Sequence, residues 1–311
     1  MSSDEKNSDK LYSYMDNEFR HDIPSGHLET TDPQKQKRKL KEFFEENVIR
    51  WDNYYDEREG NPYKHNLTIL KSILKNYDKT KTILDLGCGT GIPLIEFLKM
   101  GFSAKGCDFT DSAISISKSK MRKNNYDEKS VFKLDIEDSS TLTNEKFDII
   151  TSVGVFPHVA DEKQALENTK KLLNKHGIVL LQFRNDLFNL FTLNAYSENF
   201  FKRLIDFDTL PDDFKKHLNE FYKKTLLAET INAQFGILSK FHNPLTIQNE
   251  LFSPLGFIVK NIYFFHYHRL PPIFQKNDTK LFRKLSDEIE NPNDWRGNFL
   301  ASSFIVEAEL Q

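Results

Sequence analysis

The residues most able to bind a ligand are Asp85, Gly87, Gly89 and Gly91, which occupy alternate positions after a short apolar run. Glycine has no side chain, so a ligand can approach its backbone closely. A carboxylate just before the turn repels a pyrophosphate but can accept hydrogen bonds from an ammonium group. Residue 92 is isoleucine, so the G-x-G-x-x-G pattern of dinucleotide-binding turns is missing, and no P-loop Lys-Ser/Thr follows. The turn therefore favours a ligand that carries an ammonium group.

Two further carboxylates, Asp108 and Asp135, each follow a predicted strand. In an open α/β sheet, ligands bind beyond the carboxyl ends of the parallel strands. The distance of Asp108 from the glycine turn suits a carboxylate that accepts both hydroxyls of a ribose. Asp135 can accept the exocyclic amine of an adenine. A single aspartate after a strand is more often a helix cap or turn residue, but three of them with a glycine turn favour a nucleoside site.

The elements that must position these residues alternate between strand and helix, which predicts a parallel sheet. The run at 147–153 is apolar on both faces, as a buried parallel strand should be. We expect strands at 83–86, 102–107, 130–134, 147–153, 178–183, 256–267 and 301–309. We expect helices at 36–50, 65–74, 93–100, 111–124 and 161–174.

Four of these segments, Asp85-Leu-Gly-Cys-Gly-Thr-Gly91, Asp108, Leu134-Asp135-Ile136 and Phe147-Asp-Ile-Ile150, together resemble the successive motifs of class I S-adenosylmethionine-dependent methyltransferases of the small-molecule type. The likeness covers about residues 80–185. It implies S-adenosylmethionine as the cofactor. It also implies an α/β fold with a Rossmann-like, seven-stranded, mostly parallel sheet in the order 3-2-1-4-5-7-6, helices on both faces and an inserted helical cap. The seventh strand would be antiparallel.

By the same likeness, Asp108 would bind the ribose, Asp135 or Ile136 would meet the adenine, and the first two glycines of the turn would pass close to the methionine portion. The expected cofactor-binding residues are Asp85, Gly87, Cys88, Gly89, Asp108, Phe109, Asp135, Ile136 and Val153.

Five segments follow along the chain. The polar stretch 1–36, broken by prolines and a glycine, is expected to be a mobile tail. Its basic continuation around Lys37 is typical of a solvated helix face. The aromatic-rich stretch after 185 is too long for an ordinary connection. We therefore expect a tail at 1–36, helices covering the site at 37–80, the cofactor-binding core at 81–185, the inserted helical cap at 186–250, and the last strands of the sheet at 251–311.

The methyl acceptor should contact loops after the later strands. His158 follows the fourth strand, beside the expected position of the sulfonium methyl, and is either a general base or a hydrogen-bonded loop histidine. His266 and His268, at the end of the sixth strand, are the other candidates for removing a proton. The expected substrate-binding residues are Arg184, Asn185, Tyr267 and Arg296.

Three arginines and two histidines each have two possible roles. Arg184, Arg269 and Arg296 either converge on an anionic group of the acceptor or pair with carboxylates at the surface. His266 and His268 alternate on one strand face and could bind a metal with His158 or His242. Since no acid or cysteine accompanies them at a diagnostic spacing, we expect no metal.

Composition limits the partners. A formal net charge of −3 over 311 residues gives no broad attraction to nucleic acid. The chain has no apolar run of about 18 residues and no signal-like N-terminus, so we expect a cytoplasmic monomer or homodimer that binds no membrane. The two cysteines, Cys88 and Cys107, fall in predicted core positions, which argues against a disulfide.

We therefore predict methyl transfer from S-adenosylmethionine to an oxygen or nitrogen of a small molecule, for example a sugar or a secondary metabolite. The alternatives are a protein or nucleic-acid acceptor, and a catalytically silent cofactor-binding subunit. A nucleic-acid amino methyltransferase should carry Asn/Asp-Pro-Pro-aromatic after the fourth strand, where this chain has Gly154-Val-Phe-Pro-His158. A silent subunit should have lost the aspartates or glycines, and none is lost.

Overall fold

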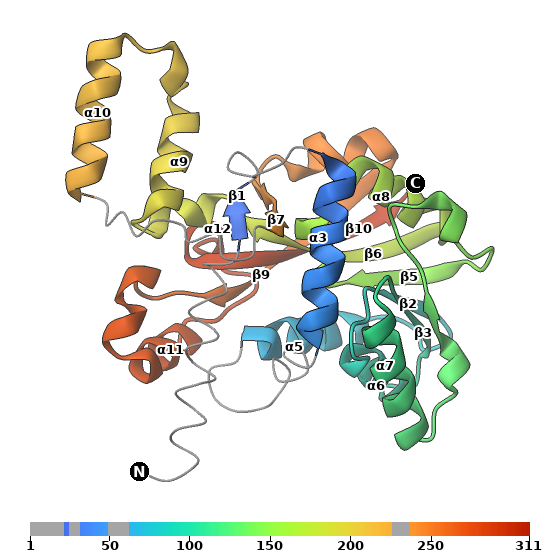
Figure 1. The fold of residues 1–311 in the computed structure, drawn as a ribbon. Helices are drawn as coiled ribbons and strands as arrows, with labels where there is room; N and C mark the ends of the chain where they lie inside the picture. Colours follow the sequence, from blue (N-terminus) through green and yellow to red (C-terminus); the bar gives the residue numbers. More distant parts are fainter. Residues whose placement is uncertain (1–21, 25–31, 49–61, 226–236) are drawn as a thin grey trace.

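The computed structural model describes residues 22–24, 32–48, 62–225 and 237–311, and Figure 1 shows their course. The centre of the molecule is a sheet of eight strands among the described residues. They are β2 (Thr82–Leu86), β3 (Ser103–Asp108), β4 (Val131–Lys133), β5 (Phe147–Ser152), β6 (Leu173–Asn185), β8 (Phe241–His242), β9 (Phe257–Tyr267) and β10 (Ala301–Leu310).

The strand order is β4-β3-β2-β5-β6-β10-β9, which confirms the predicted order 3-2-1-4-5-7-6. Strands β4, β3, β2, β5 and β6 pair in parallel, and β10 is antiparallel to both β6 and β9. The short β8 is an addition to the predicted set and pairs with the end of β6. Because the first five strands run the same way, their carboxyl ends form one edge of the sheet.

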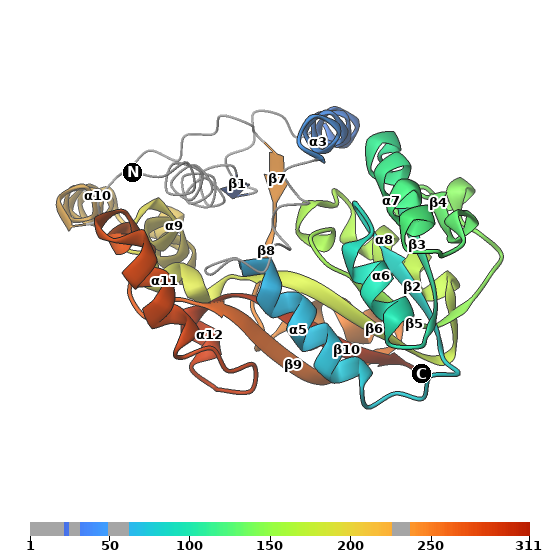
Figure 2. The ribbon, with the colours of Figure 1, turned by 90° about the horizontal axis from the view of Figure 1, so that it is seen from below.

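Successive residues of the central strands pack on opposite faces of the sheet, as the two-residue period of a strand requires. Ile83 packs with α5 (Pro62–Leu74), α6 (Ile92–Lys99) and α7 (Asp111–Lys123). Leu84, the next residue, packs with α8 (Glu162–Lys171) and the segment before β9. Figure 2 shows α5 lying across β9 and β10. Both faces of the sheet are therefore covered by helices, as predicted.

The segment 186–250, predicted as an inserted helical cap, contains both helices and strands among its described residues. Its helices α9 (Ala195–Leu204) and α10 (Asp212–Thr225) form a hairpin that projects from the sheet (Figure 1). Residues 237–242 of the same segment add two strands, β7 (Ile237–Ser239) and β8. Strand β7 pairs in parallel with β1 (Asp22–Pro24), so the insertion is tied to the N-terminal segment. Pairing partners this distant in sequence leave no local pattern, which is why the strands were missed.

Helix α3 (Pro33–Glu46) begins three residues before the predicted start, because the side chain of Asp32 caps it by accepting a hydrogen bond from the Gln34 amide at 3.0 Å. It lies against α7 and β7 (Figure 1). The expected tail at 1–36 falls outside the described residues except at 22–24 and 32–36. Beyond β9, α11 (Thr279–Asp287) and α12 (Gly297–Leu300) complete the fold.

Two further observations bear on the sequence predictions. Cys88 and Cys107 are both buried free thiols, as expected. Among the described helices, none combines the length and the apolar character needed to cross a membrane.

Candidate active site

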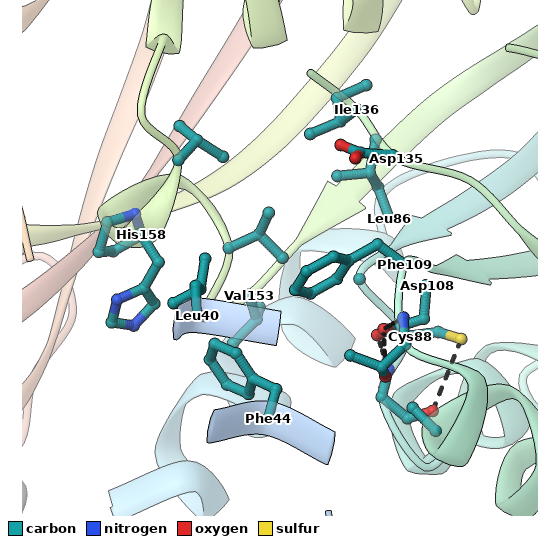
Figure 3. Close-up of a pocket in the computed structure, with 18 of the residues that line it drawn as sticks. Leu40, Phe44, Leu86, Cys88, Asp108, Phe109, Asp135, Ile136, Val153 and His158 are labelled. Atoms are coloured by element: carbon teal, nitrogen blue, oxygen red, sulfur yellow. Dashed lines mark hydrogen bonds between the residues drawn. The ribbon is translucent and has the colours of Figure 1, made fainter. Parts of the chain in front are cut away.

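A pocket lies at the carboxyl ends of β2, β3, β4, β5 and β6, and Figure 3 shows it in close-up. All nine of the residues predicted to bind the cofactor line it: Asp85, Gly87, Cys88, Gly89, Asp108, Phe109, Asp135, Ile136 and Val153. The parallel strands bring these residues together because each lies at or just after a strand end.

Asp85 is a buried carboxylate with unused hydrogen-bonding capacity. Its Oδ1 accepts a hydrogen bond from Thr151 Oγ1 at 3.0 Å, while its Oδ2 has no hydrogen-bond partner within the described part of the chain. Burial, together with the nearby charge of Asp108, raises the pKa of Asp85 to about 7 despite the bond from Thr151. A buried oxygen without a partner is costly, so this position is suited to a cationic donor from a ligand.

The glycine turn presents bare backbone to the pocket. The amides of Gly87 and Cys88 both donate to the Cys107 carbonyl, at 2.8 and 2.9 Å, and so fix the turn to β3. Gly89 has a φ of +51°, and a Cβ built there would meet nothing within 4 Å. The space beside Gly89 is therefore open, and a ligand can approach the backbone there.

Asp108 is held beside the same glycine turn by hydrogen bonds. Its Oδ2 accepts from the Gly89 amide at 3.0 Å, and its Oδ1 accepts from the amide and hydroxyl of Thr110 at 2.9 and 2.8 Å. Burial raises the pKa of Asp108 even though these bonds favour the charged form. The carboxylate is held in one orientation beside Phe109, at the position where the resemblance implies ribose binding.

At the neighbouring strand end, Asp135 is bonded to a residue that the sequence analysis did not select. Its Oδ1 accepts from the Glu137 amide at 3.1 Å, and its Oδ2 lies 2.5 Å from Nζ of Lys37 on α3. We had expected the basic run around Lys37 to be a solvated face. A usable signal was present, because Lys37 precedes Leu40 by three residues and so shares the apolar face of the helix.

That face of α3 forms a wall of the pocket through Leu40, Phe43 and Phe44, and Val48, just beyond the helix, extends it. Opposite the acidic end, Figure 3 shows His158 beside Phe44 and Leu40. The imidazole of His158 packs edge-on to the Phe44 ring, with 5.7 Å between their centroids. The His158 amide donates to the Val155 carbonyl at 2.8 Å, which closes a tight turn around the histidine.

Strand β6 contributes two further polar side chains, Gln182 and Arg184, to this end of the pocket. Gln182 accepts from the Gly154 amide at 2.9 Å and so fixes the loop after β5. The pocket therefore joins an acidic, glycine-lined end to an end with a histidine, an arginine and aromatic rings.

The other two predicted catalytic residues, His266 and His268, lie outside this pocket. Both are buried at the end of β9, with 4.9 Å between their ring centroids. Arg283 Nη1 lies 2.7 Å from Nε2 of His266, and Ser302 Oγ lies 2.8 Å from its Nδ1. Since arginine can only donate, Nε2 accepts and the ring proton points to Ser302. Burial, then neighbouring positive charge, lowers the pKa of both histidines well below the usual range.

The topology explains this correction. Strand β6 is the last strand that contributes to the pocket, and β10 lies between it and β9. Because neighbouring strands are roughly 4.8 Å apart, the end of β9 lies about 10 Å from the end of β6. A position at a strand end is therefore not sufficient to place a residue in the site.

Three of the four predicted substrate-binding residues also lie outside the pocket lining. The side-chain amide of buried Asn185 donates to the carbonyls of Gly297, Asn298 and Ala301, at 2.8–3.1 Å. The Tyr267 hydroxyl donates to the Asn291 carbonyl at 2.6 Å. Both residues thus hold the segment before β10 in place. Among the described arginines, Arg269 pairs with Glu288 and Arg296 with Asp294 at the surface, so of the three predicted to converge only Arg184 lines the pocket.

Comparisons with known proteins agree with this geometry. A family model described as a methyltransferase domain matches residues 77–240. Ubiquinone biosynthesis O-methyltransferase of Bartonella quintana (strain Toulouse) is 26% identical over 163 residues, which are 52% of this chain and 64% of that protein. The protein of the same name from Haemophilus ducreyi (strain 35000HP / ATCC 700724) is 30% identical over 140 residues, 41% of this chain and 56% of that protein. This chain thus spans less than two thirds of either relative.

A solved structure shows the same fold. Magnesium protoporphyrin IX methyltransferase from Synechocystis PCC 6803, crystallised with bound SAH, superposes with a TM-score of 0.52 at 13% identity. The superposition covers 88% of this chain and 100% of that chain.

Proposed function

We propose that this chain, which belongs to the methyltransferase-domain family and whose cofactor is S-adenosylmethionine, transfers the cofactor's methyl group to a hydroxyl oxygen of a small molecule. The observation that carries the proposal is the continuity of the pocket. One cavity contains the acidic, glycine-lined end and the end with His158 and Arg184. A cofactor and an acceptor can therefore be bound in contact with each other.

The residues present fit the cofactor. Asp85 Oδ2 is a buried acceptor that an ammonium group can satisfy, and the open space at Gly89 admits a ligand against the backbone. Asp108 is oriented by three hydrogen bonds, as a carboxylate that must accept from two neighbouring hydroxyls should be. We assign the methionine portion to Asp85 and the glycine turn, the ribose to Asp108, and the adenine to Asp135 and Ile136.

When bound, S-adenosylmethionine supplies a methyl group that its sulfonium activates for in-line attack. The protein must hold the attacking oxygen near that carbon and take its proton. His158 lies at the pocket wall and is the group we assign to the proton. Phe44 and the rest of the α3 face limit the access of water. Arg184 is placed to bind an anionic substituent of the acceptor.

Two observations favour a hydroxyl on a planar ring over the other acceptors that the sequence left open. The wall beside His158 consists of Leu40, Phe44, Val153 and Val155, which suit a flat apolar ring. The two relatives described above are named ubiquinone biosynthesis O-methyltransferases, which supports oxygen over nitrogen. A protein or nucleic-acid acceptor fits a pocket covered by a helix less well, and the net charge of −3 gives nucleic acid no attraction.

Calorimetric titration with S-adenosylmethionine and with S-adenosylhomocysteine tests the cofactor assignment. We expect micromolar or tighter binding of both, and we expect Asp108→Asn to weaken it by about tenfold through loss of charge-assisted bonds. Absence of binding to either compound would refute the proposal.

Transfer of labelled methyl to 3,4-dihydroxybenzoate, with glucose as the comparison, tests the acceptor class. The aromatic acid offers a phenolic hydroxyl to His158 and a carboxylate to Arg184. Labelling of the aromatic acid in preference to the sugar supports the proposal, and an Arg184→Gln variant should raise its KM. Preferential labelling of the sugar would contradict the planar-ring assignment while leaving methyl transfer intact.

A further inference from the structure

Helix α3 is attached to the molecule differently from the helices that cover the sheet. Buried Leu40 and Phe43 form a small apolar cluster with Phe44 and Phe109, separate from the two large clusters that pack on the sheet faces. Phe109 is itself a pocket residue. The apolar contacts of α3 are therefore made largely with the pocket walls.

One polar attachment of α3 is at the adenine end of the pocket. Lys37 Nζ lies 2.5 Å from Asp135 Oδ2 and 4.0 Å from Glu137 Oε2. Glu137 Oε1 in turn accepts hydrogen bonds from the amides of Ala160 and Asp161, both at 2.9 Å. These two amides belong to the loop that carries His158. Lys37 thus links the acid assigned to the adenine with the loop of the proposed base.

The second attachment is at the other end of the helix. The carboxylate of Glu45 accepts from the amides of Asp111 and Ser112, at 2.8 and 3.0 Å. These amides open α7, whose N-terminal groups have no partner within their own helix. Glu45 therefore fixes the end of α3 to α7, and Lys37 fixes the beginning to the loop after β4.

We propose that Lys37 and Glu45 are positioning residues that hold α3 as a cover across the pocket, and that the cover retains the cofactor and completes the acceptor wall. The inference rests on the proposed function, because it assigns the adenine to the Asp135 end. On this proposal α3 moves during cofactor exchange, because its Leu40, Phe43 and Phe44 line the pocket. A bound cofactor fills the space under the helix and adds apolar contacts, so it stabilises the closed position.

The test measures release of S-adenosylhomocysteine from the full chain by rapid displacement with excess S-adenosylmethionine. We expect Lys37→Gln and Glu45→Gln each to accelerate release by about threefold, as for partly exposed ion pairs and caps. The double variant should reach about tenfold, because the two sites are distant enough for their effects to add. Lys37→Arg should restore slow release, since it keeps the charge.

The matched control is Arg38→Gln on the same helix, where Arg38 is 72% exposed and faces Glu42. It should leave release unchanged. Hydrogen exchange of residues 33–46 should slow when S-adenosylhomocysteine is added to the unmodified chain. Unchanged exchange there, equal acceleration by Arg38→Gln and Lys37→Gln, or no rescue by Lys37→Arg would each overturn the cover while leaving the cofactor site intact. Failure of the unmodified chain to bind either compound would overturn both the cover and the proposed function.

Discussion

The two ends of the pocket are built in different ways. The acidic, glycine-lined end, to which we assign the cofactor, comes from consecutive strand ends of the sheet, and its groups are fixed by main-chain bonds such as those from Gly87 and Cys88 to the Cys107 carbonyl. We call it the cofactor end. The other end, to which we assign the acceptor and which we call the acceptor end, combines α3, the loop of His158 and the end of β6. Backbone from the insertion braces that loop, because the Lys240 amide donates to the Pro157 carbonyl at 2.8 Å.

This difference indicates where substitutions can change substrate specificity with little loss of stability. Altering the cofactor end disturbs the sheet and its turn, whereas the acceptor end consists of side chains on a helix and on loops. One fold can therefore keep its cofactor while its acceptor varies. Substitutions at the two ends should separate cofactor binding from transfer.

The largest effect is expected at the acceptor end. His158→Gln should lower kcat for methyl transfer by about 10²- to 10⁴-fold, since a general base is lost, while the affinity for S-adenosylhomocysteine stays the same. Single-turnover transfer of labelled methyl and calorimetry measure the two quantities. A fall in affinity that matches the fall in rate would show that the two ends are not separable.

The next largest effect is expected at Asp85. Asp85→Asn keeps the shape but loses the charge that an ammonium group requires, so affinity for S-adenosylmethionine at pH 8 should fall by about 30-fold. The transfer rate at saturating cofactor should fall much less.

The pH dependence provides a second measurement at this residue. The pKa of Asp85 is raised from 3.8 to about 7, so the folded state holds this proton more tightly than the unfolded chain. Stability from the protonated form is full below pH 4 and is lost as the pH rises through about 7. Cofactor affinity should change in the opposite direction and fall by about tenfold for each pH unit below 7. Asp85→Asn should remove both dependences, and their survival in the variant would assign them to another group.

The buried His266 provides a contrast with His158, because it lies outside the pocket. Alanine offers no partner to Ser302 or to Arg283 at this position, so His266→Ala should lower the free energy of unfolding by about 1–3 kcal/mol. Because His266 lies outside the pocket lining, kcat should be almost unchanged. Urea denaturation and the labelled transfer assay test this, and a large loss of rate in a stable variant would return His266 to the catalytic set.

The smallest effect is expected for alanine substitutions at two glycines, one inside the pocket and one outside it. Gly89 and Gly101 both have positive φ, at +51° and +90°, and a Cβ at either would meet nothing within 4 Å. Alanine should therefore strain both positions similarly, but only Gly89→Ala places a methyl group in the pocket. We expect about tenfold weaker binding of S-adenosylhomocysteine for Gly89→Ala and no change for Gly101→Ala, measured by calorimetry. Equal affinities would mean that the ligand does not approach the turn.

The sequence determined the fold and which residues line the acidic, glycine-lined end of the pocket, and the match to class I S-adenosylmethionine-dependent methyltransferases is confirmed. The reason is that strand, turn and carboxylate lie within a few residues of one another. Asp85, Asp108 and Asp135 each follow from one local pattern, and a parallel sheet has to align its strand ends. The strand order was also predicted correctly, because the motifs resemble those of a family whose strand order is known.

Only the tertiary structure decided which distant residues meet across the pocket. His158 and His266 both lie near strand ends, yet β10 separates the end of β9 from the site and leaves His266 in a buried cluster. Lys37 looked like part of a solvated face, and it lies 2.5 Å from Asp135 only because α3 folds back over the sheet edge. Such contacts depend on the packing of segments far apart in the chain, and local periodicity carries no record of them.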